Sequence, residues 1–67
     1  VVEATVTGVT AGVAAGATVF GYSPGGPEHA TPQALRAAGA TQVFTSMADL
    51  PALLAAYNVS ALTATTP

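Results

Sequence analysis

Charge and cysteine are the two features this sequence has least of. Of its 67 residues only 6% are charged, none is cysteine and one is histidine. The absence of cysteine excludes a disulfide framework. One histidine with three carboxylates cannot supply the four ligands of a closed zinc site. A single basic residue, Arg36, cannot neutralise the several phosphates that nucleic-acid binding requires.

Long, strongly apolar runs are missing as well. The uncharged stretch 4–27 has Gly8, Gly12 and Gly16 at the four-residue spacing that brings membrane helices together. Its threonines lower the hydrophobicity, however, and it contains no run of about 20 strongly apolar residues. No basic segment precedes an apolar run, as it would in a signal peptide. We therefore expect a cytoplasmic protein that does not bind membranes, and the lack of cysteine suits a reducing compartment.

The short length predicts one small domain with a marginal core. A chain of this size buries only about 60% of the surface that it exposes when unfolded. Small domains of this kind usually need a disulfide, a metal or a partner subunit for stability. A surface so poor in charge does little to keep copies apart. We expect a homo-oligomer, or association with the remainder of a longer protein.

Signals for strands and helices alternate along the sequence. Strands are expected at 1–3, 17–22 and 41–45, where β-branched and aromatic residues gather. Helices are expected at 5–15 and 32–38, with Thr5 and Thr31 as N-caps and Gly16 and Gly39 as terminators. The order predicts a parallel α/β sheet with right-handed crossovers.

A third helix is expected after a single turn that begins at Ser46. Pro51 fits only the first turn of a helix, where its missing N–H does no harm. The side chains of Leu50, Leu53, Leu54 and Tyr57 then form an apolar stripe. In the first expected helix Val6, Val9 and Val13 share one face in the same way. Residues 58–67 have no clear period and are expected to be a flexible tail.

The first eight residues read Val-Val-Glu-Ala-Thr-Val-Thr-Gly, and a small-residue helix ending in Ala15-Gly16 follows them. This pattern resembles the final third of a haloacid-dehalogenase-like (HAD) hydrolase of the phosphatase and phosphomutase branch. In that branch a strand ends in Val-Glu-Asp-Ser/Thr and is followed by x-x-Gly. The later Ala-Leu-Arg-Ala-Ala-Gly-Ala and Leu-Pro-Ala-Leu-Leu segments continue the resemblance to about Tyr57. It implies a three-layer Rossmann-like core fragment over 1–57, with about three parallel strands.

The resemblance also implies a site chemistry. Glu3 corresponds to an acid beside a Mg²⁺ ion in the family, which makes Glu3 the expected metal contact and Mg²⁺ the expected cofactor. The metal-binding aspartate of the family is replaced here by Ala4, which has no ligating atom. The family's nucleophilic aspartate and lysine lie upstream of the resembling part, and this sequence has no lysine. We therefore assign no catalytic residue, and we expect a phosphorylated small molecule as the ligand.

Ligands of open parallel sheets bind outside the carboxyl ends of the strands. The loop Ser23-Pro24-Gly25-Gly26 is expected at that edge, where Ser23, Gly25 and Gly26 are candidates for holding a phosphate through backbone N–H groups. The alternative is an ordinary connecting loop. Glu3 has an alternative too, as a carboxylate stabilised by a helix N-terminus. His29 and Arg36 are expected at the surface.

Three hypotheses of function follow. In the first hypothesis the chain is a remnant or truncated form of a HAD-like phosphatase, without the aspartate nucleophile. Alternatively it is a non-catalytic α/β module that associates with itself or binds a partner. In the third hypothesis it is one piece of a longer hydrolase with no independent role. The incomplete acid set at Glu3 and Ala4 weighs against independent catalysis.

Overall fold

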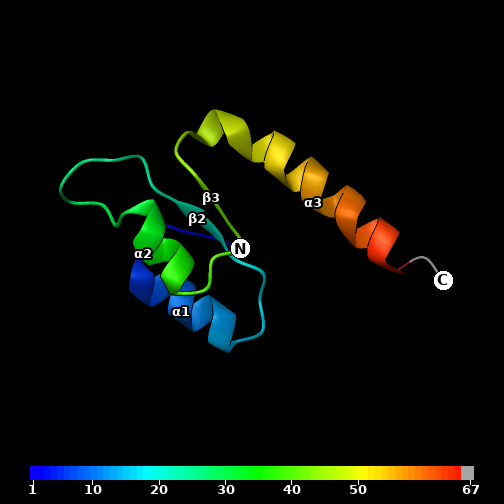
Figure 1. Cartoon of the computed structure of the whole chain (residues 1–67), viewed down its shortest axis with the longest axis horizontal. Coiled ribbons are helices and arrows are strands. Elements are labelled where there is room, and N and C mark those ends of the chain that lie inside the picture. The colour runs from blue at the N-terminus through cyan, green and yellow to red at the C-terminus, as the bar shows by residue number, and fades with distance from the viewer. Residues whose placement is uncertain (66–67) are drawn as a thin grey trace.

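Three short parallel strands form the centre of the molecule. The structure is a computed structural model that describes residues 1–65. The strands are β1 (Val2–Glu3), β2 (Phe20–Tyr22) and β3 (Gln42–Phe44), in the spatial order β1-β2-β3. The register pairs Glu3 with Gly21, and Gly21 with Val43. The predicted α/β fold, with parallel strands that alternate with helices, is confirmed (Figure 1).

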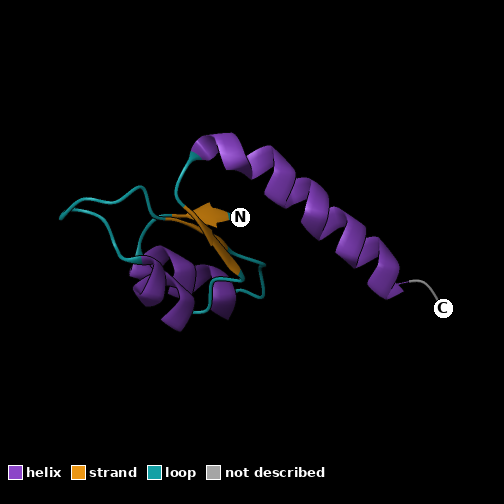
Figure 2. Cartoon of the chain, turned by 45° about the horizontal axis from the view of Figure 1, so that its top comes forward, coloured by secondary structure: helices purple, strands orange, loops and turns teal. Residues whose placement is uncertain are grey.

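Two helices connect the strands and cover one face of the sheet. These are α1 (Val6–Ala14) and α2 (Pro32–Ala37). Two right-handed crossovers that step in the same direction across a sheet place both helices on the same face, as Figure 2 shows. The predicted caps are confirmed, because Thr5 accepts a hydrogen bond from the Gly8 N–H at 3.0 Å and Thr31 accepts one from the Ala34 N–H at 3.2 Å.

The main core lies between these helices and the sheet. Val9 of α1, Val19 and Leu35 of α2 are fully buried and contact one another there. Helix α2 comes close to β2, because a Cβ added to Gly21 would lie only 3.2 Å from the Leu35 Cβ. The expected stripe on α1 is buried at one position only. Val6 and Val13 are 43% and 42% exposed, because the short strands offer α1 room for one central contact.

The chain leaves β3 through a single 3₁₀ turn (Met47–Asp49) and enters α3 (Leu50–Thr65). Ser46 caps the turn by accepting a hydrogen bond from the Ala48 N–H at 3.3 Å, as expected. Pro51 sits in the first turn of α3. The helix does not stop near Tyr57 but continues to Thr65, since no glycine or proline interrupts 52–65. Residues 66–67, the end of the predicted tail, lie outside the described residues.

Helix α3 covers the second face of the sheet, and an aromatic contact attaches it. The Tyr57 ring meets the Phe20 ring edge to face, with centroids 5.6 Å apart, and its hydroxyl lies 3.0 Å from the Thr18 Oγ1. On the same face the rings of Tyr22 and Phe44 pack together, with their centroids 5.2 Å apart. Of the predicted stripe on α3, Leu54 and Tyr57 remain 42% and 39% exposed.

The far half of α3 extends beyond the sheet and makes the molecule long and thin. Its extents are 45 × 27 × 15 Å, and the C-terminal end of α3 lies far from the strands (Figure 1). Within residues 1–65, no helix combines the length and the apolar character needed to cross a bilayer.

The contact between Tyr57 and Thr18 predicts a measurable contribution to stability. Tyr57→Phe keeps the ring on Phe20 but removes the hydroxyl, so the free energy of unfolding should fall by about 0.5–1 kcal/mol. Urea unfolding followed by circular dichroism measures this change. Tyr22→Phe is the matched control on the same face. Equal losses in the two variants would mean that the bond to Thr18 contributes nothing of its own.

Candidate functional site

The carboxyl ends of the three strands lie at one edge of the sheet. Because the register aligns Glu3, Gly21 and Val43 side by side, the segments that follow them leave the sheet together. These segments are Ala4-Thr5, the loop that starts at Ser23, and Thr45-Ser46. This is the edge at which open parallel α/β sheets bind ligands. The sequence-predicted site residues are therefore found on this side of the molecule.

Glu3 lies half-buried at the end of β1, against the first turn of α1. A Cβ added to Gly8 would come within 2.9 Å of the Glu3 carboxyl carbon, and within 3.1 Å of the Thr5 Oγ1. The missing side chain at Gly8 thus provides the space that the carboxylate occupies. The N-terminus of a helix carries a partial positive charge that favours a carboxylate there. The position of the carboxylate therefore requires a residue without a side chain at position 8.

The residues of this chain do not by themselves fit a Mg²⁺ site. Mg²⁺ takes hard oxygen ligands in octahedral geometry and usually binds through one or two carboxylates together with substrate phosphates. Among residues 1–65 no three histidine, aspartate or glutamate side chains gather around a common point. Ala4, beside Glu3, offers no ligating atom. A metal at this edge would need ligands from outside the described residues.

Ser23 joins the binding-edge loop to the rest of the fold. Its side chain is almost fully buried, and the hydroxyl donates a hydrogen bond of 2.7 Å to the Ala30 carbonyl. Its backbone N–H donates to the Phe44 carbonyl of β3 at 2.9 Å. Ser23 therefore ties the start of the loop both to its end at Ala30 and to β3. A phosphate could receive the Ser23 hydroxyl only after the bond to Ala30 had broken.

Gly25 and Gly26 form the exposed tip of this loop. Both have positive φ angles, +94° and +92°, which side chains rarely allow. His29 holds the tip through two contacts. Its ring Nδ1 lies 2.7 Å from the Gly25 carbonyl oxygen, and its backbone N–H donates a hydrogen bond to the Gly26 carbonyl at 3.2 Å. Glu28 lies 3.8 Å from the His29 ring. His29 is exposed, as expected, and its ring is occupied in holding the tip.

Two cavities that no sequence motif indicates lie between α3 and β3, and the larger one reaches the carboxyl end of β3 at Thr45. One has a volume of about 270 Å³ and the other of about 430 Å³. Half of their lining residues are alanine, threonine or leucine, and the lining residues form no recognisable motif. They arise from the angle at which α3 crosses the sheet, and no local pattern encodes that angle.

Comparison of the chain with known protein families, with curated proteins and with solved structures found no match. The resemblance to HAD-like hydrolases therefore depends on the residues themselves.

The position of Glu3 against Gly8 can be tested with a double-mutant cycle. Alanine usually stabilises a helix by up to about 1 kcal/mol relative to glycine. With Glu3 present, we expect Gly8→Ala to destabilise the fold, because the new Cβ meets the carboxylate. In the Glu3→Ala background the same change should stabilise it, giving a coupling energy of about 1 kcal/mol or more. Chemical unfolding of the four proteins measures this coupling. If the two Gly8→Ala effects are the same, the carboxylate does not occupy this space in solution.

Proposed function

We propose that the chain is a HAD-like hydrolase of the phosphatase type in a reduced or truncated form. The observation that carries the proposal lies at the end of β1. The Glu3 carboxylate packs on the first turn of α1, where Gly8 has no side chain and so leaves room for it. Glu3 and Gly8 stand at the family spacing, and an added Cβ at Gly8 would approach the Glu3 carboxyl carbon to 2.9 Å. The parallel strands bring this acid and the Ser23 loop to one edge.

The ligand of this edge is proposed to be a phosphorylated small molecule. Glu3 would bind a metal ion that contacts the phosphate, and the other ligands of this ion would come from outside the described residues. The loop tip at Gly25 and Gly26 is exposed and would offer backbone N–H groups to phosphate oxygens. Ser23 would contribute by holding the tip in place through its bond to Ala30.

The same chain is not proposed to hydrolyse phosphate esters alone. Phosphoryl transfer through a covalent intermediate needs a carboxylate nucleophile aimed at phosphorus. The one aspartate, Asp49, lies in the turn that follows β3, two strands away from Glu3. A second polypeptide segment would have to supply the nucleophile. The alternative, a non-catalytic module that binds its own copies, is favoured by the open outer edge of β3, the last strand of the sheet.

Restoring the missing acid tests this assignment. Ala4→Asp puts a second carboxylate beside Glu3, so Mg²⁺ should bind about tenfold more tightly than to the unchanged chain. Magnesium titration followed by amide chemical shifts measures the affinity and locates the ion near 3–8. The Ala4→Asp/Glu3→Gln double variant should lose the gain. Assays with small phosphate esters, with Mg²⁺ and with chelator, should show no turnover by the unchanged chain.

Thr45→Asp is the matched control, because it adds the same charge at the same sheet edge but at the end of β3. An equal gain in both variants would show that net charge alone attracts the ion, and the family assignment would lose its support. Magnesium-dependent turnover by the unchanged chain that persists in Glu3→Gln would also contradict the proposal.

A further inference from the structure

The outer edge of β3 is open. β3 is the last strand of the sheet, and within residues 1–65 no other strand pairs with it on that side. The Phe44 carbonyl accepts its hydrogen bond from Ser23, so the backbone groups of Phe44 point toward β2. Within β3 the backbone groups alternate in direction, so those of Val43 point outward. Thr41, just before the strand, departs from this alternation and donates its N–H to the Val19 carbonyl at 2.8 Å. An edge of this kind is a template for one more strand.

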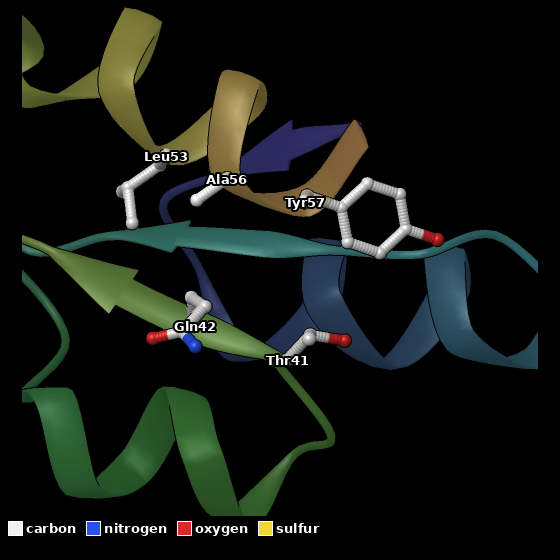
Figure 3. A pocket seen from close by; sticks show the side chains of 5 residues that line it. All are labelled: Thr41, Gln42, Leu53, Ala56 and Tyr57. Atoms are coloured by element: carbon white, nitrogen blue, oxygen red, sulfur yellow. The ribbon is translucent and has the colours of Figure 1, made fainter. Parts of the chain in front are cut away.

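The two cavities lie along this same edge. The smaller is lined by Thr41 and Gln42 on the strand side and by Leu53, Ala56 and Tyr57 on α3. The larger lies between Val43, Phe44 and Thr45 and the start of α3, at Asp49, Ala52 and Leu53. Leu53 lines both and separates them. Figure 3 shows Leu53, Ala56 and Tyr57 of α3 above the strands, with Thr41 and Gln42 on the chain of β3.

Helix α3 leaves this edge uncovered because of the direction in which it runs. It begins beside the end of β3 and crosses toward β2, where Tyr57 meets Phe20 and Thr18. The helix residues over the edge include Ala52 and Ala56, whose small side chains leave room for close approach. Asp49 is the one charged residue in the lining of either cavity.

We propose that a second copy of the chain occupies this edge, with the two β3 strands pairing antiparallel about a two-fold axis at Val43. The outward N–H and C=O of Val43 then exchange two hydrogen bonds with those of its counterpart. Three strands from each copy form one six-stranded sheet. The two α3 helices lie on the same face of that sheet, on either side of the axis, and narrow the cavities.

Charge and surface area both favour a second copy as the occupant. Antiparallel pairing puts the two Asp49 side chains at opposite ends of the interface, so no like charges meet. The chain exposes 4233 Å², whereas a compact monomer of its mass exposes about 3,800 Å². A specific interface buries about 800 Å² per partner. The edge of β1 is a weaker alternative, because that strand has two residues and neither cavity borders it.

Pairing at β3 is independent of the hydrolase assignment. Glu3 belongs to β1, at the far side of the sheet from β3, and its surroundings stay free in the pair. Loss of self-association and loss of magnesium binding by Ala4→Asp are therefore separate outcomes.

The mass in solution tests the pairing. Sedimentation equilibrium of the full chain should give twice 6.5 kDa. Ala52→Lys puts a long charged side chain into the interface and should weaken the dimer by about tenfold or more. Ala55→Lys is the matched control, because Ala55 is also exposed on α3 but lines neither cavity; its dimer should be unchanged. Circular dichroism checks that each variant is folded. A monomer at every concentration, or equal effects of both lysines, would overturn the proposal.

Disulfide cross-linking tests the register of the two β3 strands. The sequence has no cysteine of its own, so only the introduced thiols can react. Pairing about Val43 brings Thr41 of one copy beside Thr45 of the other, just beyond the ends of the paired strands, within the Cα separation of about 4.4–6.8 Å that a disulfide spans. Oxidised glutathione should therefore cross-link a mixture of Thr41→Cys and Thr45→Cys chains into a heterodimer. Each variant alone should remain largely uncross-linked, because like positions lie four residues apart. Cross-linking of Thr41→Cys with itself, as fast as in the mixture, would refute this register.

Discussion

A parallel sheet must be covered on both of its faces, and residues 1–65 contain only three α-helices with which to do it. The two crossovers commit α1 and α2 to the same face, so α3 alone is left for the other. One helix cannot cover a face completely. The exposed outer part of β1, the open edge of β3 and the cavities beside Leu53 are all consequences of that shortage.

The parts of the fold that local chemistry controls could be predicted from the sequence. At each of the caps Thr5, Thr31 and Ser46, the side-chain hydroxyl accepts a hydrogen bond from a backbone N–H two or three residues further on. Such a bond needs no distant partner. Burial depends on distant partners, and here prediction failed. The exposure of Val6 and Val13 follows from how little sheet lies beneath α1. The length of α3 was underestimated because its second half lacks an apolar period, although nothing in it breaks a helix.

The candidate site was predictable to a similar degree. The end of β1 could be located because an acid, a helix cap and a glycine follow one another at fixed spacing. The role of Ser23 could not, because the Ala30 carbonyl that it binds comes within reach only when the loop closes. The cavities at β3 were beyond prediction for the same reason, since two segments that share no motif form them.

The way α3 is attached has a consequence for how the molecule opens. Its described side-chain contacts with the sheet layer are those of Tyr57 with the Phe20 ring and the Thr18 hydroxyl, and Tyr57 does not belong to the core of Val9, Val19 and Leu35. Helix α3 can therefore detach as one cooperative unit while the other two helices stay folded on the strands. Detachment would uncover the Phe20 ring and the Phe44 side chain, which faces the start of α3 across the larger cavity. In a crowded cell, this short-lived apolar surface would govern the chain's tendency to aggregate.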